Sequence, residues 1–272
     1  MIYEKDLQSK TRFPKISIIT PTLNQASFIE ETILSVLSQD YPNLEYFIID
    51  GGSVDGTPDI VKKYSEKLNF ISEPDDGQVD AINKGMKLIS GDIIGFINSD
   101  DLYLPNSFNY VRDFFSSHPE AKIITGKCKN IDISGNETRE LIKHYKNFWL
   151  KIGTTNSLKV TNFISQPSTF WRADLVKNIG YFNREYRYAF DYEYWLRASQ
   201  YYKIHFVDEY LASFRVYSKS ITGSNSKKQF EEEQQVASNY ANSFYKALHK
   251  LHSSLSYLLY SYVFNKQKYG DN

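Results

Sequence analysis

Two adjacent carboxylates, Asp100 and Asp101, are the residues of this sequence whose type and position most directly suggest metal chemistry. They follow an apolar run at 92–97 that is typical of a buried strand. Carboxylates at a strand end can hold Mg²⁺ or Mn²⁺ together with phosphate oxygens, and such a cation offsets the charge of a leaving diphosphate. The alternative is a helix N-cap beside a solvated acid, and this pattern alone leaves both interpretations open.

A second polar segment follows the apolar run at 46–49 and begins with Asp50, two glycines and Ser53. Asp50 is suited to accept a hydrogen bond from a nucleobase imide, and Gly52 lets backbone approach a ligand closely. The same residues are also typical of a turn-rich loop that caps the next helix.

A third polar group, at 75–85, crowds acidic, amide and glycine residues at the start of a predicted helix. Capping accounts for one or two of these side chains. It does not account for Asp80, Asn83 and Lys84 together, although a solvated helix face would.

A fourth candidate is the aromatic segment at 188–196, which contains Asp191 and Glu193. An acid among aromatic rings tends to have a raised pKa, which suits a general base. The alternative is an acidic helix start favoured by the helix dipole.

The elements around these clusters alternate between strand and helix. We predict strands at 16–20, 46–49, 69–72 and 92–97, and helices at 24–38, 57–67 and 78–89. This alternation is typical of a parallel sheet flanked by helices, in which ligands bind beyond the carboxyl ends of the strands. The polar clusters after residues 20, 49 and 97 all lie at those ends. The first hundred residues therefore predict an α/β domain with a site at one sheet edge.

Beyond residue 104 the pattern is looser. We predict a helix at 104–117, a strand at 122–127, a hairpin turn at 132–137, an irregular stretch at 140–165, a segment at 170–177 that leads into a helix, a helix at 191–202, strands at 203–207 and 212–216, a loop at 218–228, and one or two helices at 229–264.

Composition narrows the functional classes. The 32 basic and 32 acidic residues among 272 cancel, so there is no overall positive field to hold nucleic acid. The single cysteine, Cys128, cannot form an intramolecular disulfide and fits a reducing compartment. Residues 1–14 read as neither a signal peptide nor an anchor, and no apolar run is long enough to span a membrane. We expect a cytoplasmic protein.

Taken in order, the motifs resemble family 2 glycosyltransferases of the GT-A fold, most closely the bacterial branch that builds O-antigen and capsule polysaccharides. The resemblance covers about residues 15–220. The matching stretches are 18–24, 49–57, 76–85, 91–95, 98–101 and 190–192. The resemblance implies a Rossmann-like, mostly parallel central sheet flanked by helices, with a helical C-terminal extension.

The same resemblance implies roles by position. Asp191 corresponds to the base of an inverting displacement, Asp100 and Asp101 to the ligands of Mn²⁺ or Mg²⁺, and Asp50 to the residue that reads the base, usually uracil. The residues implied to bind a UDP-sugar donor are Thr20, Pro21, Thr22, Asn24, Asp50, Gly52, Ser53, Gly77, Gln78, Asp80, Asn83, Asp100 and Arg215.

Three positions depart from the family pattern. Asn98 replaces the first acid of the metal motif, Phe190 replaces the acid that usually precedes the base, and Tyr217 replaces a histidine that often follows the late arginine motif. If that histidine is a third metal ligand elsewhere in the family, this protein binds its cation more weakly or with more water. Arg215 is expected to meet either a phosphate or a surface carboxylate.

The acceptor side is the least patterned part of the sequence. The segment at 166–172 resembles the family's acceptor-side segment, which makes Gln166, Trp171, Glu193 and Trp195 candidates for contact with a saccharide or lipid-linked saccharide acceptor. For the two tryptophans, stacking on a sugar and packing in the core are equally compatible with the sequence.

We divide the chain into an N-terminal extension (1–14), a GT-A domain (15–222) and a helical C-terminal region (223–272). The GT-A domain comprises a nucleotide-binding half (15–103) and an acceptor half (104–222).

Apolar residues recur at helical spacing in the C-terminal region, namely Phe244, Leu248, Leu251, Leu255, Leu258 and Tyr262. This amphipathic helix is expected either to pack on the catalytic domain or on a partner subunit, as in a homodimer, or to lie on the cytoplasmic membrane face through 240–268.

Three other functions compete with a glycosyltransferase. A non-catalytic sugar-nucleotide-binding subunit is favoured only by Phe190 and Tyr217. A nucleotidyltransferase would need a glycine-rich, arginine-bearing loop after the first strand, where this chain has Pro21, Thr22, Leu23 and Asn24. A dinucleotide-dependent dehydrogenase would need Gly-x-Gly-x-x-Gly there, which is absent from the sequence.

Overall fold

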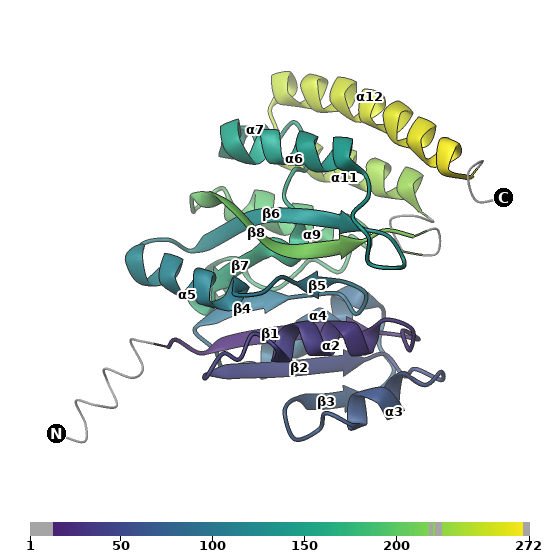
Figure 1. The fold of residues 1–272 in the computed structure, drawn as a ribbon. Coiled ribbons are helices and arrows are strands. Elements are labelled where there is room, and N and C mark those ends of the chain that lie inside the picture. The colour runs from purple at the N-terminus through teal and green to yellow at the C-terminus, as the bar shows by residue number, and fades with distance from the viewer. Residues whose placement is uncertain (1–12, 218–219, 221–224, 269–272) are drawn as a thin grey trace.

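A single curled sheet with helices on both faces organises the protein (Figure 1). This computed structural model describes residues 13–217, 220 and 225–268. Within them, the eight-stranded sheet has the order β3-β2-β1-β4-β7-β6-β8-β5. The predicted extension at 1–14 and loop at 218–228 lie largely outside the described residues.

The nucleotide-binding half is the parallel part of this sheet. Its strands are β1 (Ile16–Thr22), β2 (Leu44–Asp50), β3 (Asn69–Ser72) and β4 (Ile93–Phe96). The register pairs Thr22 with Asp50, and Asp50 with Ser72. The last residues of three neighbouring strands therefore form one row at the carboxyl edge of the sheet.

Three helices cover the two faces of this half: α2 (Ile29–Leu37), α3 (Thr57–Lys62) and α4 (Gln78–Leu88). Alternate isoleucines of each strand serve opposite faces, so that Ile18 packs in the cluster containing α2 and Ile19 in the cluster containing α4. The first helix begins later than predicted. Asn24 has a left-handed backbone (φ 53°), and a turn precedes Ile29.

The acceptor half is a mixed rather than a parallel sheet. It contains β6 (Ile123–Ile131), β7 (Thr169–Arg172) and β8 (Ile204–Arg215), with α5 (Ser107–Ser117) beside them, and β8 pairs with β5 (Leu102–Tyr103), the last strand before this half. The strand β7 runs antiparallel to both β4 and β6, whereas β6 and β8 are parallel. The two strands predicted at 203–207 and 212–216 are one strand, because pairing with β6 continues through a bulge near Lys127. Only the second part of the segment predicted at 170–177 is helical, in α8 (Ala173–Ile179).

The stretch at 140–165, predicted to be irregular, instead contains the helices α6 (Glu140–Ile152) and α7 (Thr155–Leu158), before the short 3₁₀ turn η1 (Gln166–Ser168). In α6, Leu150 is the one fully buried residue, whereas Leu141, Phe148 and Ile152 are exposed. The apolar residues Leu141, Tyr145, Phe148 and Ile152 recur at helical spacing, so the sequence carried a helical pattern here that the prediction missed.

The C-terminal region is helical, as predicted. It comprises α11 (Ser226–Tyr240) and α12 (Ser243–Lys268), which stack above α9 (Phe190–Ala198) and beside α6 at the end of the molecule opposite β3 (Figure 1). His249 of α12 is buried, and its ring stacks on that of Tyr192 in α9. One face of α12 therefore packs on α9. In the described part of the chain, no helix is both long and apolar enough to span a membrane.

Candidate active site

Asp50 lies at the centre of the row of strand ends and is fully buried. One carboxylate oxygen accepts hydrogen bonds from the Ser53 amide (3.0 Å) and the Ser72 hydroxyl (2.6 Å), and the other accepts from the Ser53 hydroxyl. A carboxylate offers about four acceptor positions, so Asp50 retains capacity for one further hydrogen bond.

The loop after β1 is hydrogen-bonded to the loop after β2. The Asn24 amide donates to the Ser53 hydroxyl (2.7 Å), and the Asn24 side chain accepts from the Val54 amide (2.9 Å). Gly52 has a positive φ of 89°, which a glycine adopts without strain. A Cβ on the neighbouring Gly51 would lie 2.7 Å from an Asp75 carboxylate oxygen. Three predicted donor loops therefore converge at this edge.

The residues of β1 differ in their access to this edge. The Thr20 side chain is fully buried and its hydroxyl lies 3.1 Å from that of Tyr46, so contact between Thr20 and a nucleoside stays a prediction. Pro21 is also buried. The Thr22 hydroxyl is buried and has no hydrogen-bond partner among the described residues.

Asn98 connects the donor loops to the acidic pair. Its amide oxygen accepts a hydrogen bond from the Gln78 side chain (2.6 Å), and its nitrogen donates to Asp101 (3.1 Å). The other Asp101 oxygen accepts from the Arg215 backbone amide (2.8 Å). Asp101 is fully buried, and burial together with the neighbouring Asp100 raises its pKa well above the usual value. Both carboxylate oxygens of Asp101 accept hydrogen bonds from the protein, so this side chain fixes the backbone around the acidic pair rather than facing a cation.

Asp100 is arranged differently. Its side chain is partly exposed, one oxygen accepts a hydrogen bond from the Tyr217 hydroxyl (3.1 Å), and the other accepts none from another described residue. Tyr217, one of the three departures from the predicted family pattern, therefore contacts the carboxylate predicted to bind the metal.

The fit of a divalent cation depends on this free oxygen. Within the described ranges, no group of three or more His, Cys, Asp or Glu side chains lies close enough to hold a metal ion. Mg²⁺ commonly uses one or two carboxylates and takes its remaining ligands from substrate phosphates and water. A cation held in that way fits Asp100.

Arg215 is buried, and of the two predicted partners it meets the surface carboxylate, because it pairs with Glu31, whose side chain is 58% exposed. Its side chain is 1% exposed and donates to the Asp100 carbonyl (2.9 Å) and to the Glu31 carboxylate (2.6 Å). It also donates to the carbonyls of Asp132 and Ile133. The guanidinium therefore fixes the backbone of the acidic pair from behind.

These positions predict different results for the two acids. We expect Asp100→Ala to remove the metal dependence of nucleotide binding while thermal stability changes little, because one oxygen of Asp100 is unpaired. We expect Asp101→Ala to destabilise the protein by about 1–3 kcal/mol, because it leaves buried donors without partners. Calorimetric titration with Mn²⁺ and thermal melting of both variants measure the two effects. Equal loss of stability in both variants would contradict the division of roles.

The predicted donor helix α4 is joined to the acceptor half by polar contacts. The Asn83 side chain exchanges two hydrogen bonds with the Phe182 backbone (2.9 and 3.0 Å). Arg184 pairs with Asp80 (3.4 Å) and with Asp76. The chain before α9 is therefore held over the start of α4, where Gly77 has a positive φ of 107°.

Asp191 is the second residue of α9, and its side chain is partly exposed. Burial of the carboxyl group raises its pKa to about 6. Two nearby groups act in the opposite direction and lower the pKa: the Tyr192 amide, which donates a hydrogen bond to Asp191 (2.7 Å), and the charged Lys146. The preceding residue, Phe190, packs edge-on against Phe182 and obliquely against Phe96 at the end of β4. A carboxyl group with a pKa near 6 has the properties of a general base.

The predicted acceptor residues are mostly structural in this conformation. Trp171 and Trp195 are fully buried and pack against each other, so neither stacks on a sugar. Glu193 is 3% exposed and is paired with Arg197 (2.8 Å). Gln166 is buried and donates to the Phe96 carbonyl (2.5 Å). The sequence could not separate core packing from sugar contact for these aromatic positions.

The structure adds residues that the sequence analysis did not select. Lys146 of α6 and Glu233 of α11 lie close enough to Asp191 to interact with it electrostatically, and burial with Asp191 nearby raises the pKa of Glu233 to about 7. Glu232 contacts the backbone just before α9. The acidic run at 231–233 was visible in the sequence, but its pairing with α9 depends on tertiary structure.

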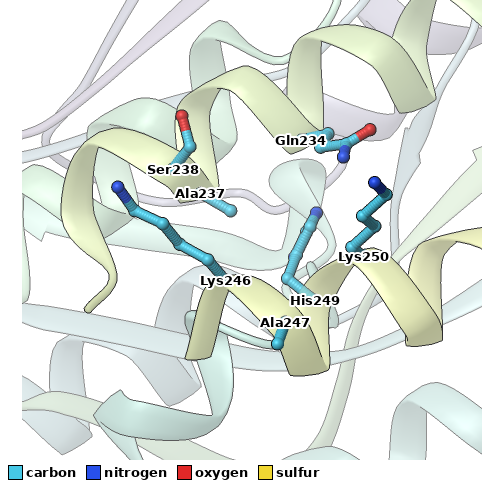
Figure 2. Close-up of a pocket in the computed structure, with 7 residues that line it drawn as sticks. All are labelled: Gln234, Ala237, Ser238, Lys246, Ala247, His249 and Lys250. Carbon is cyan, nitrogen blue, oxygen red and sulfur yellow. The ribbon is translucent and has the colours of Figure 1, made fainter. Parts of the chain in front are cut away.

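A cavity of about 280 Å³ lies apart from these groups, between α11 and α12. Figure 2 shows Lys246, His249 and Lys250 of α12 extending toward Gln234 and Ala237 of α11. None of the predicted site residues lines this cavity.

Comparison with known proteins agrees with the fold. Residues 17–180 match the family Glycosyl transferase family 2. An uncharacterized glycosyltransferase of Rickettsia typhi is 28% identical over 227 residues, which are 79% of this chain and 68% of that protein. A PGL/p-HBAD biosynthesis glycosyltransferase of Mycobacterium bovis is 29% identical over 191 residues, 68% of this chain and 70% of that protein. A glycosyltransferase of Rickettsia felis is 27% identical, and the match spans 80% of this chain but 37% of that protein.

Two solved structures share the architecture. Residues 1–349 of TarS from Staphylococcus aureus, in complex with UDP-GlcNAc, align with a TM-score of 0.65 and 20% identity, covering 88% of this chain and 71% of that one. The mannosyltransferase PcManGT from Pyrobaculum calidifontis, in complex with GDP-Man and Mn²⁺, aligns with a TM-score of 0.68 and 19% identity over 88% and 69% of the two chains. The fold is GT-A, and the chain belongs to glycosyl transferase family 2.

Proposed function

We propose that this protein transfers a sugar from a nucleoside-diphosphate donor, a UDP-sugar, to an acceptor hydroxyl with inversion. The observation that carries the proposal is the placement of Asp191. Its segment is tied to the donor helix α4 through Asn83 and Arg184, and the carboxyl group has a pKa of about 6. A base is thus held beside the edge where the loops after β1, β2 and β4 converge.

The displacement needs one base and a stabilised leaving group. Asp191 takes the proton of the acceptor hydroxyl as that oxygen bonds to the anomeric carbon, and the bond from this carbon to the diphosphate oxygen breaks. A divalent cation bound to Asp100 would supply positive charge to the diphosphate. Asn98, Gln78 and Asp101 hold the Asp100 segment in place.

The choice of UDP is supported by one of the two nucleotide-bound neighbours, since TarS was solved with UDP-GlcNAc and PcManGT with GDP-Man. The acceptor that we propose is a saccharide, free or lipid-linked, of bacterial surface polysaccharide assembly. The outer face of α12 exposes Phe244, Leu251, Leu255 and Leu258. We predict that either a second copy of the chain or the membrane surface covers this face.

Release of nucleoside diphosphate from a panel of UDP-, GDP- and dTDP-sugars, with and without Mn²⁺, tests this proposal without knowledge of the acceptor. We expect metal-dependent release from a UDP-sugar, because water can replace the acceptor hydroxyl at a slow rate. Release from a GDP- or dTDP-sugar alone would keep the mechanism and replace the donor. Binding without release from any donor, even with saccharide acceptors added, would favour the non-catalytic subunit.

A further inference from the structure

One carboxylate of α11 accepts hydrogen bonds from consecutive backbone amides just before α9. The Glu232 side chain accepts from Arg187 (3.1 and 3.2 Å), Tyr188 (2.6 Å) and Ala189 (3.0 Å). These amides belong to the loop that ends where α9 begins, two residues before Asp191. A single side chain from the C-terminal region thus holds the backbone at 187–189, directly before the helix that carries the proposed base.

The start of α9 needs such a partner. The first amides of a helix have no acceptor within the helix, and a side-chain oxygen usually accepts from them. The N-cap position of α9 is Ala189, which has no polar side chain, and no local side-chain cap forms there. Glu232, from another helix, accepts from the Ala189 amide at this N-cap and from the two amides before it, and its negative charge complements the positive end of the α9 dipole.

Further contacts hold α11 on both sides of Asp191. The Asn239 side chain donates to the Tyr186 hydroxyl (2.9 Å), before the base in the chain. The Tyr240 hydroxyl donates to Glu193 (2.5 Å), after the base. The helix therefore contacts α9 and its preceding loop at three places that surround Asp191 in sequence.

We propose that Glu232 is a positioning residue for Asp191, so that α11 is a functional part of the acceptor side rather than an appendage. This inference rests on the proposed role of Asp191 as the base. Glu232 acts through the backbone at 187–189, and it fixes both the direction of the Asp191 side chain and the electrostatic field around it. The charged groups that face Asp191 from neighbouring elements are Lys146 of α6 and Glu233 of α11.

The experiment compares Glu232→Ala and Glu232→Gln with the matched control Glu231→Gln in the full-length protein. Glu231 lies on the same helix, with a side chain that is 63% exposed and pairs with Lys227 one turn away. For each variant, kcat for diphosphate release is measured from pH 5 to 9 with the donor found above. The Kd for UDP with Mn²⁺ and the Tm are measured alongside.

We expect Glu232→Ala to lower kcat by about 10-fold or more, because small misplacement of a reacting group has effects of up to about 100-fold. UDP affinity should stay within about 2-fold of the wild type, because Glu232 contacts none of the donor loops. The acidic limb of the pH profile should move to lower pH in both variants. Without the Glu232 carboxylate at the start of α9, the positive end of the helix dipole acts more strongly on Asp191 and stabilises its charged form. Glu231→Gln should leave all readings unchanged.

Two results would overturn the inference. The first is a kcat and pH profile of Glu232→Ala that match the wild type. The second is a parallel fall of kcat, UDP affinity and Tm with an unmoved acidic limb, which would mean a general structural role. If Glu232→Ala does not fold, the near-isosteric Glu232→Gln decides through its pH profile alone. Turnover that survives in Asp191→Asn would instead refute the proposed base, which separates that failure from this one.

Discussion

Replacing Asp191 by asparagine is expected to lower diphosphate release by about 10²- to 10⁴-fold, the usual contribution of a positioned general base. Asparagine keeps the shape of the side chain but cannot take a proton at neutral pH. The Kd for UDP should stay within about 2-fold of the wild type, because no donor-loop residue contacts Asp191. The wild-type rate should fall as pH drops through about 6, where the carboxylate becomes protonated. Full turnover in Asp191→Asn would contradict the assignment of the base.

The same variant should be more stable than the wild type at neutral pH. Burial raises the pKa of Asp191 from its usual 3.8 to about 6, so the folded state disfavours the charged form. The wild type loses stability as pH rises from about 4 to about 6, and by pH 7 the loss is on the order of 1–3 kcal/mol. Asparagine does not ionise and avoids that loss.

Thermal melts of Asp191→Asn and the wild type at pH 5 and pH 8 measure this effect. The difference in Tm should favour the variant and should be larger at pH 8. The control is Asp59→Asn, at a side chain that is 86% exposed, and its Tm should follow the wild type at both pH values. A variant that is less stable than the wild type at pH 8 would show that Asp191 is a structural acid.

Arg215→Met is expected to lower stability by about 1.5–3 kcal/mol, the usual contribution of hydrogen bonds to a charged group, because the buried guanidinium has several acceptors although its ionic partner Glu31 is 58% exposed. The guanidinium donates to the carbonyls of Asp100, Asp132 and Ile133 as well as to Glu31. Methionine fills much of the same volume but donates nothing. Urea unfolding monitored by tryptophan fluorescence measures the loss.

Arg112→Met is the matched control. The Arg112 side chain donates only to Asp113 and Asn109 of its own helix, so its loss should change stability by less than about 1 kcal/mol. If Arg215→Met kept its stability and lost UDP affinity instead, Arg215 would contact the donor phosphates, and the structural role would be the wrong interpretation.

The parallel half of the fold was predictable because its strands are short apolar runs that end in polar clusters. The isoleucines of 16–20 and 46–49 are buried on both sheet faces, so the sequence shows continuous apolar strands there. The convergence of Asp50, Asn98 and Asp100 at one edge follows from parallel topology alone. The GT-A fold and the family, which the motif order indicated, are confirmed by comparison.

The acceptor half was less predictable because its elements depend on distant partners. The strand β7 is placed between β4 and β6, which come from separate parts of the chain, so its four residues carry no local signal. Trp171 and Trp195 are large enough to serve either a core or a sugar, and only burial decides between them. The contact of Glu232 with 187–189 spans more than 40 positions in the sequence, and no periodicity reveals it.

The central claim is a metal-dependent nucleotide site at the carboxyl ends of β1, β2 and β4. Calorimetric titration of UDP into the wild-type protein, with and without Mn²⁺, tests it most directly. We predict UDP binding that strengthens at least about 10-fold when Mn²⁺ is present, since a cation at Asp100 would bridge the protein and the diphosphate. The account would be contradicted if neither UDP, GDP nor dTDP bound in either condition, or if Mn²⁺ left the affinity unchanged.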